Sequence, residues 1–213
     1  MGGRVGQATA KQLQKAVERG IQDGREESVE LVEAIDVTFC GSGNLAQVYF
    51  HAFGHRATLA ELNAAFPGMV DATIAHEGVG FAVVIGDDGQ PIAMCKYGAR
   101  NLHTGQVEGK DPLASYGEVT LRAWQVRRVA DFPSAGDLII ISTLYPDGTV
   151  AAMEELIGNH GGLGGEQTDS FILHPADMDV PPTRNAVDLY PVLDSRRGRP
   201  SPPPKQVASY NPR

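Results

Sequence analysis

Alternating and continuous apolar runs predict several strands in this chain. Residues 35–40 alternate between apolar and polar positions, which is typical of a strand. Residues 79–85 and 91–97 are apolar segments on either side of a Gly-Asp-Asp-Gly turn, and together they predict a β-hairpin. Residues 137–144 are almost entirely apolar, which predicts a central strand that is buried on both faces.

Helical patterns lie between these strands. Thr58 is followed three residues later by Glu61, and this spacing predicts a capping box at the start of a helix that runs through Phe66. A second short helix is expected over residues 70–76, and a third over residues 119–129, where apolar positions recur at helical spacing.

Composition divides the chain into three parts. Residues 1–33 are rich in Gln, Glu, Lys and Arg, and we expect a peripheral helical arm there. Residues 34–180 are expected to form one α/β domain with a mixed sheet, flanking helices and a β-hairpin insertion, with residues 98–117 as a loop. Residues 181–213 are basic and Pro-rich, and predict an irregular, disordered tail.

Residues 149–175 contain the most distinctive pattern of the chain. A helix is expected over residues 149–157 and a buried strand over residues 171–173, and five glycines fall within the eight residues 158–165 between them. His160 lies among these glycines, and its imidazole is a candidate metal ligand or proton carrier. The alternative is a structural histidine that caps a helix end or bonds a carbonyl group.

A second glycine motif follows the first predicted strand. Gly41, Gly43 and Ala46 match G-x-G-x-x-A, and Glu61 lies 18 residues beyond Gly43. This is the sequence form of a dinucleotide site, in which a helix begins directly after the glycines. Residues 47–50 favour a strand instead, so the preferred interpretation is a strand with a glycine bulge. A separate site role for Ser42 or Asn44 stays open.

Charge and cysteine usage exclude some functions. The net charge is −8, and residues 195–213 carry basic residues and no acidic one, so the remainder is more acidic still. An acidic body argues against nucleic-acid binding through a broad basic face. Cys40 and Cys95 are expected to be buried free thiols. No apolar run of about 18 residues is present, so no membrane span is expected, and the simplest location is cytoplasmic.

Four stretches of the chain resemble one bacterial family and keep its order. They are GSGNLAQVYF (41–50), HEGVGFAVV (76–84), HTGQVEGKDPLASYG (103–117) and EELIGNHGGLGGEQTDSFILHP (154–175). They are similar to the C-terminal part of alkaline-phosphatase-superfamily proteins described as type I phosphodiesterase or nucleotide pyrophosphatase-like. In that superfamily a late histidine in a glycine-flanked His-Gly turn is a zinc ligand. The resemblance therefore implies a metal-binding role for His160, followed by Gly161.

The resemblance also implies what other segments would have to supply. The superfamily builds a two-zinc site that includes a nucleophilic Thr or Ser and an Asp-His-Gly turn, and this sequence contains no Asp-His-Gly. No catalytic residue and no organic-cofactor site therefore carries over to this chain, and Lys110 stands where the family pattern has an acidic residue. The remaining histidines are expected to be surface or structural residues: His51, His55, His76, His103 and His174.

Three functional hypotheses follow from these observations. The first is a hydrolase of phosphate esters or nucleotides, in which this chain is the C-terminal portion that completes a two-zinc site together with an upstream partner chain. The second is a non-catalytic binding module derived from the same family. The third, a nucleotide-dependent oxidoreductase, rests on the motif from Gly41 to Ala46 alone.

Overall fold

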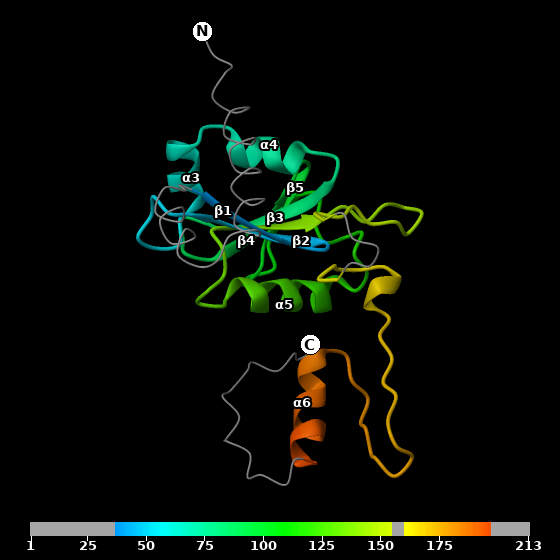
Figure 1. Cartoon of the computed structure of the whole chain (residues 1–213). Helices are drawn as coiled ribbons and strands as arrows, with labels where there is room; N and C mark the ends of the chain where they lie inside the picture. The colour runs from blue at the N-terminus through cyan, green and yellow to red at the C-terminus, as the bar shows by residue number, and fades with distance from the viewer. Residues whose placement is uncertain (1–36, 155–159, 197–213) are drawn as a thin grey trace, which may run out of the picture.

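The structure is a computed structural model that describes residues 37–154 and 160–196. Its centre is a seven-stranded sheet with helices on both faces, as Figure 1 shows. The strand order is β1-β2-β7-β3-β4-β5-β6. The strands are β1 (Val37–Ser42), β2 (Leu45–Phe50), β3 (Val79–Ile85), β4 (Pro91–Cys95), β5 (Gly98–Asn101), β6 (Val107–Gly109) and β7 (Leu138–Ser142). The predicted α/β class is confirmed.

Every pairing between these seven strands is antiparallel, whereas the sequence analysis expected a mixed sheet. The difference arises from β7, which returns after a helix and lies between β2 and β3. It runs antiparallel to both neighbours, so the long connection does not produce a parallel pair. The predicted β3–β4 hairpin is present with the expected turn.

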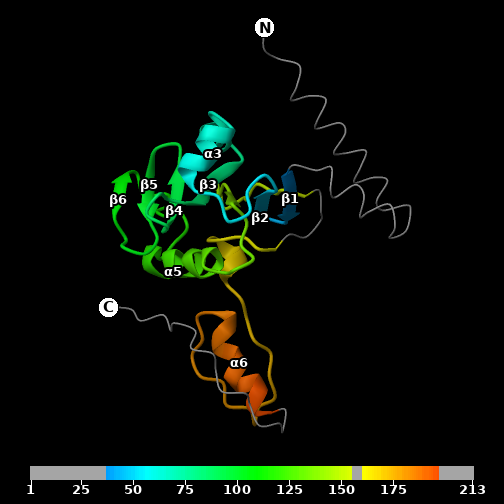
Figure 2. The same cartoon turned by 90° about the vertical axis from the view of Figure 1, so that its left-hand side faces the viewer.

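Two helices cover one face of the sheet and a third covers the other. Helices α3 (Leu59–Ala65) and α4 (Met69–Ala75) lie on one side, and α5 (Val119–Ala130) lies on the opposite side, as Figures 1 and 2 show. The predicted capping box is confirmed, because Thr58 Oγ1 accepts a hydrogen bond from the Glu61 N–H while the Glu61 carboxylate accepts one from the Thr58 N–H.

The central position of β7 explains why its sequence is apolar throughout. Its five residues are all buried. Leu138 and Ile140 pack in the core beneath α3 and α4, whereas Ile139 and Ile141 pack in the core beneath α5. Because successive side chains of a strand point to opposite faces, a strand covered on both faces needs apolar residues at every position.

Residues 98–117 were expected to form a loop, but they contain β5 and β6. The two strands are only four and three residues long, and β6 is exposed throughout. Their sequence therefore lacks the apolar alternation by which strands are recognised. They extend the sheet to its edge, which Figure 2 shows on the side opposite β1.

The region after β7 departs most from the sequence-based expectation. Residues 149–154 are not helical, and residues 155–159 of the predicted helix lie outside the described part of the chain. The Ala151 N–H donates to Thr143 O and the Met153 N–H donates to Gly43 O, so the backbone donors of this segment are used in pairing with the sheet end. A helix would need those same donors for its own carbonyl groups.

The predicted buried strand at residues 171–173 is also wrong. Phe171 and Leu173 are 90% and 94% exposed, and the segment has no strand partner among the described residues. A short 3₁₀ helix, η1 (Glu166–Thr168), precedes it. An apolar run predicts burial only when a sheet is available to receive it, and the seven strands of the described sheet form ladders only with one another.

A helix lies within the segment that was expected to be irregular. Helix α6 (Ala186–Ser195) begins with a capping box formed by Asn185 and Asp188, and it contains Pro191. The cap supplies the local start signal that the Pro-rich composition obscured. Residues 197–213 of the predicted tail and residues 1–33 of the predicted arm lie outside the described residues.

Candidate functional site

The two glycine motifs of the sequence meet at one end of the sheet. Gly43 and Asn44 form the tight turn between β1 and β2, where Ser42 pairs with Leu45. The Asn44 N–H donates to the carbonyl oxygen of His160 over 3.0 Å. A Cβ atom on Gly43 would lie 2.1 Å from that same oxygen, and Gly43 has a φ of +59°. Glycine is therefore required there by contact as well as by conformation.

Asn44 makes several of the hydrogen bonds that hold the β1–β2 turn to its neighbours. It is buried, its side-chain Nδ2 donates to Ala151 O, and its carbonyl oxygen accepts hydrogen bonds from the N–H and the hydroxyl of Ser142. The separate site role that the sequence left open for Asn44 is thus a structural one: it joins the β1–β2 turn to the end of β7 and to the segment before His160.

This geometry replaces both earlier interpretations of residues 41–46. The strand continues through Ser42 and turns, so there is no bulge at Gly41, and residues 45–50 form β2. A dinucleotide site requires a helix to begin after the glycines, so that its N-terminus meets the pyrophosphate. Glu61, the acidic residue of the fingerprint, is instead bonded to Thr58 in the helix cap. We therefore assign no dinucleotide role to this motif.

Two of the glycines that follow His160, Gly161 and Gly164, also lie against protein backbone. A Cβ atom on Gly164 would lie 2.8 Å from Tyr116 Cα, and one on Gly161 would lie 3.2 Å from Ser42 O. Gly164 has a φ of +73°. The loop uses these glycines to approach the domain closely, rather than to leave an open cradle for a ligand.

The imidazole of His160 is exposed, whereas its backbone is anchored through the bond from Asn44. Within the described residues the ring makes no hydrogen bond, and no group of three or more His, Cys, Asp or Glu side chains is arranged to hold a metal ion. The side chain of His160 is therefore available to a partner or an ion, and its role as a zinc ligand stays a prediction. A structural role would have required a buried ring bonded to backbone groups.

The other five histidines are surface residues with local partners, as expected. Each is exposed and bonds a nearby group. The pairs are His51 with Thr38, His55 with Glu61, His76 with the Gly78 N–H, His103 with Asp131 and His174 with Pro175 O. None of these pairs brings a second histidine beside the first, so none forms a two-histidine metal site.

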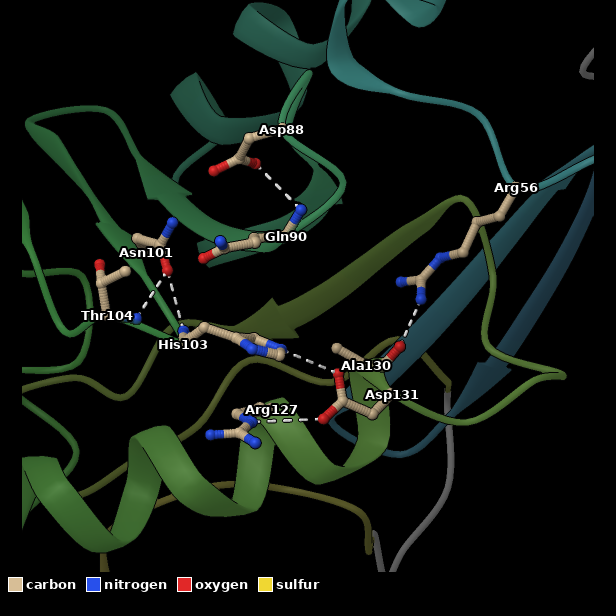
Figure 3. A network of polar contacts seen from close by, with 9 residues as sticks. All are labelled: Arg56, Asp88, Gln90, Asn101, His103, Thr104, Arg127, Ala130 and Asp131. Carbon is tan, nitrogen blue, oxygen red and sulfur yellow. Dashed lines mark hydrogen bonds and ion pairs between the residues drawn. The ribbon is translucent and has the colours of Figure 1, made fainter.

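A polar network at the end of α5, drawn in Figure 3, is structural. The Asp131 carboxylate contacts Arg127 Nε through Oδ2 and His103 Nε2 through Oδ1, each over 3.3 Å. The Arg56 guanidinium donates to Ala130 O, and burial lowers the pKa of Arg56 while Asp137 and Asp131 act to raise it. A cation at the C-terminus of a helix interacts favourably with the helix dipole. The network thus fixes the end of α5.

Cys40 was expected to be buried, but it is exposed on the edge strand β1, while Cys95 is half-buried. Phe39, which precedes Cys40 on β1, is exposed as well. An edge strand is covered less completely than a central one, and the short apolar run in the sequence did not distinguish the two positions. Both thiols are free.

A cavity of about 390 Å³ adjoins the glycine loop. Its apolar wall comes from the sheet and α5, and its polar rim comes from α5, the loop after His160 and the start of α6. The lining includes the polar residues Arg122, Gln125, Thr168, Arg184 and Asn185 and the backbone of Gly161. His160 itself does not line this cavity, although Gly161 and Gly162 do.

Arg122 is the best-placed cation of this cavity. Its guanidinium donates to Tyr116 O, Gln125 Oε1 and Thr168 Oγ1 at 2.9–3.0 Å, so its position is fixed before any ligand arrives. Burial lowers the pKa of Arg122, opposed by the charges of Asp169 and Glu118. The sequence analysis missed this residue. The available signal was the spacing of Arg122, Gln125 and Val129 along one helix face.

Comparison of the chain with protein-family models, with curated proteins and with solved structures finds no match. The helices within residues 37–154 and 160–196 include none that is long and apolar enough to cross a membrane. The family resemblance and the geometry of the described residues are therefore the basis for a functional proposal.

Proposed function

We propose that this chain belongs to a metal-dependent phosphodiesterase, to which it contributes His160 as one zinc ligand while a partner chain contributes the others. The observation that carries the proposal is the exposed imidazole of His160 on a backbone-anchored turn. The bond from the Asn44 N–H fixes the backbone of His160 and leaves its ring available to an ion. A metal-bound histidine also hydrogen-bonds through its second ring nitrogen, and in this proposal the partner chain supplies that acceptor.

The described residues fit a zinc ion only in part. Zinc needs three or four protein ligands, and these residues place no second candidate ligand beside His160. The nucleophile and the remaining ligands must then come from segments that a partner supplies, for which an upstream-encoded chain is the first candidate. Zinc would supply Lewis acidity toward a phosphate ester. We assign no catalytic step to the residues of this chain.

The cavity beside the loop supports a phosphate-ester or nucleotide substrate. Arg122 lines it with a guanidinium group that is already held by three hydrogen bonds. Arginine binds phosphate oxygens through paired N–H groups, and pre-positioning lowers the entropic cost of that contact. Apolar side chains from the sheet and α5 would contact the organic part of the substrate.

The test measures zinc affinity and phosphodiester hydrolysis on the chain alone and on the chain mixed with the upstream-encoded protein. We expect weak zinc binding alone, tight binding in the mixture, and hydrolysis of a nitrophenyl phosphodiester only in the mixture. His160→Ala should abolish the gain, whereas His174→Ala, which alters another exposed histidine, should retain it. Activity of the mixture that survives His160→Ala would overturn the proposal.

A second candidate is a non-catalytic binding module. It is favoured by the close packing of the loop glycines against Tyr116 and Ser42, which explains those glycines without any ligand. In that case the chain would bind its partner or a small molecule with the same affinity in zinc and in a chelator. A zinc-dependent partner interaction that His160→Ala removes would decide against the module.

A further inference from the structure

A second cleft, of about 470 Å³, opens at the same end of the sheet but does not include His160. It lies among the end of α4, the start of β3, the end of β4 and the segment that precedes α5. Its lining includes the polar and charged residues His76, Glu77, Lys96, Tyr97, Lys110, Asp111, Ser115, Tyr116 and Thr143. A volume of this size accommodates a small organic ligand.

The cleft gathers both lysines of the described residues. Lys96 and Lys110 are the two lysines within 37–154 and 160–196, and each ammonium group lies over the same Tyr97 ring, at 5.6 Å and 5.5 Å from its centroid. Tyr97 is 65% exposed. In a chain of net charge −8 this is a local concentration of positive charge.

The β5–β6 hairpin brings the two lysines together. Lys96 precedes β5 and Lys110 follows β6, and the Lys110 N–H donates to Tyr97 O over 2.9 Å. A Cβ atom on Gly98 would lie 2.4 Å from the Lys110 N atom, so only glycine permits this approach. The two strands that the sequence did not reveal thus bring two cations to one aromatic ring.

Asp111, an acid that lines the cleft, forms its ion pair with Arg100 rather than with these lysines. Both oxygens of Asp111 accept hydrogen bonds from Arg100, the shortest at 2.6 Å, and Asp111 Oδ1 also accepts from the Leu113 N–H. Neither Lys96 nor Lys110 has an ion pair among the described residues. Glu77 is the other carboxylate of the lining, and it forms no ion pair within the described part of the chain.

Neutral donors complete the lining. The Gly78 N–H donates to His76 Nδ1, and in the neutral tautomer this bond leaves the Nε2–H as a free donor. The hydroxyl of Ser115 is exposed at the same cleft, and the Thr143 hydroxyl is already donated to Glu77 O. Two ammonium groups, an imidazole and a hydroxyl match the charge and the several acceptor oxygens of a phosphate dianion.

We propose that this cleft binds the phosphate group of a small phosphate monoester, held by Lys96 and Lys110 beside Tyr97. The two ammonium groups attract the dianion, which in turn relieves their mutual repulsion, and this attraction outweighs the repulsion from the single Glu77 carboxylate of the lining. The site is independent of the role proposed for His160, since that residue does not line the cleft.

Calorimetric titration of the full chain at low salt tests the proposal with three ligands: inorganic phosphate, adenosine monophosphate and adenosine. We expect the first two to bind and adenosine to give no heat of binding. Lys96→Gln and Lys110→Gln should each weaken binding about tenfold, the scale of one lost charge-assisted contact. Arg127→Gln, which removes one positive charge on α5 outside the cleft, should leave the affinity within about twofold.

The outcomes separate this proposal from the previous one. Because neither lysine has an ion pair in the described structure, both variants should keep the far-ultraviolet circular dichroism and the melting temperature of the parent chain. His160→Ala should not change phosphate affinity, whatever it does to zinc binding. The proposal is overturned if phosphate and adenosine monophosphate fail to bind at about 10 mM, if adenosine binds as well as its monophosphate, or if either lysine variant binds like the parent.

Discussion

The glycine loop after His160 and the lysine cleft make the same use of glycine and differ in what surrounds it. In the loop, Gly164 lets the chain approach the backbone of Tyr116, and in the cleft Gly98 lets Lys110 approach Tyr97. The loop presents one exposed imidazole with no second metal ligand among the described residues. The cleft presents two cations over one aromatic ring.

The difference shows how little a glycine-rich sequence says about ligands. Glycine permits close approach, but the approaching group can be the protein's own backbone. A binding site is indicated by side chains that converge from separate elements, as those of Lys96 and Lys110 do. The glycine loop and the lysine cleft are neighbours in this fold, because Tyr116 contacts the loop and also lines the cleft.

The largest expected effect tests whether the loop is packed as described. Gly43→Ala should lower the free energy of unfolding by about 3 kcal/mol, because the new Cβ would meet His160 O and because φ is positive. Gly89→Ala is the matched control: its φ is also positive, at +77°, but nothing lies within 4 Å. It should lose only about 1 kcal/mol. Equal losses in chemical denaturation would mean that the loop does not pack on the β1–β2 turn.

The next effect tests the electrostatics of the cleft. Asp111→Asn removes the mostly buried carboxylate that accepts hydrogen bonds from the Arg100 guanidinium. The substitution should lower the free energy of unfolding by about 2 kcal/mol at neutral pH. Burial tends to raise the pKa of Asp111, but the hydrogen bonds from Arg100 and Leu113 and the charge of Arg100 outweigh it, and the pKa is lowered. The ion pair is the reason that Asp111 leaves the two lysines available.

The pH dependence of that loss has a definite sign. A carboxyl group with a lowered pKa stabilises the folded state above its unfolded pKa of about 3.9, and the contribution disappears as the pH falls through the folded value. The difference in stability between the parent chain and Asp111→Asn should therefore be largest at neutral pH and shrink below about pH 4. A difference that is constant across thermal unfolding from pH 3 to 7 would contradict the ion pair.

Tyr116 connects the two regions and gives a smaller effect. Its hydroxyl donates to Ser142 O over 2.8 Å, and Tyr116→Phe should cost about 1.5 kcal/mol by leaving that carbonyl without this donor. Burial raises the pKa of Tyr116 to about 12. The contribution of the phenol is thus complete below its unfolded pKa of about 10 and is lost as the pH rises toward 12. Ultraviolet titration measures this by comparing the tyrosines of the parent chain and the variant. If Tyr116→Phe shows as many late-titrating tyrosines as the parent chain, the raised pKa of Tyr116 is refuted.

Local signals in the sequence predicted the part of the fold that local chemistry determines. The Thr58–Glu61 capping box, the β3–β4 hairpin and the central strand β7 each depend on neighbouring residues or on burial on both faces, and all three are present. Zinc binding by His160 is not tested by the structure and stays a prediction.

Long-range partners decided the regions that the sequence did not predict. Residues 149–154 have a helical apolar spacing, yet their N–H groups bond Thr143 and Gly43, which lie at the end of the sheet. Residues 171–173 are apolar but have no sheet to join among the described strands. The approach of Lys96 and Lys110 to the same Tyr97 ring depends on two strands that are too short and too polar to recognise in the sequence. No pattern within a few residues contains this information.

The smallest expected effect on stability concerns His160. Its ring is exposed and makes no hydrogen bond within the described residues, and its anchoring bond uses the backbone carbonyl, which alanine retains. His160→Ala should therefore change the free energy of unfolding by no more than about 0.5 kcal/mol. A buried, bonded histidine would cost about 1–3 kcal/mol through its stranded partners. Thermal and denaturant unfolding with and without zinc measure the change, with His174→Ala as the control for an exposed histidine outside the loop. A loss in the larger range without zinc would mean that the ring supports the loop, and would count against a free metal ligand.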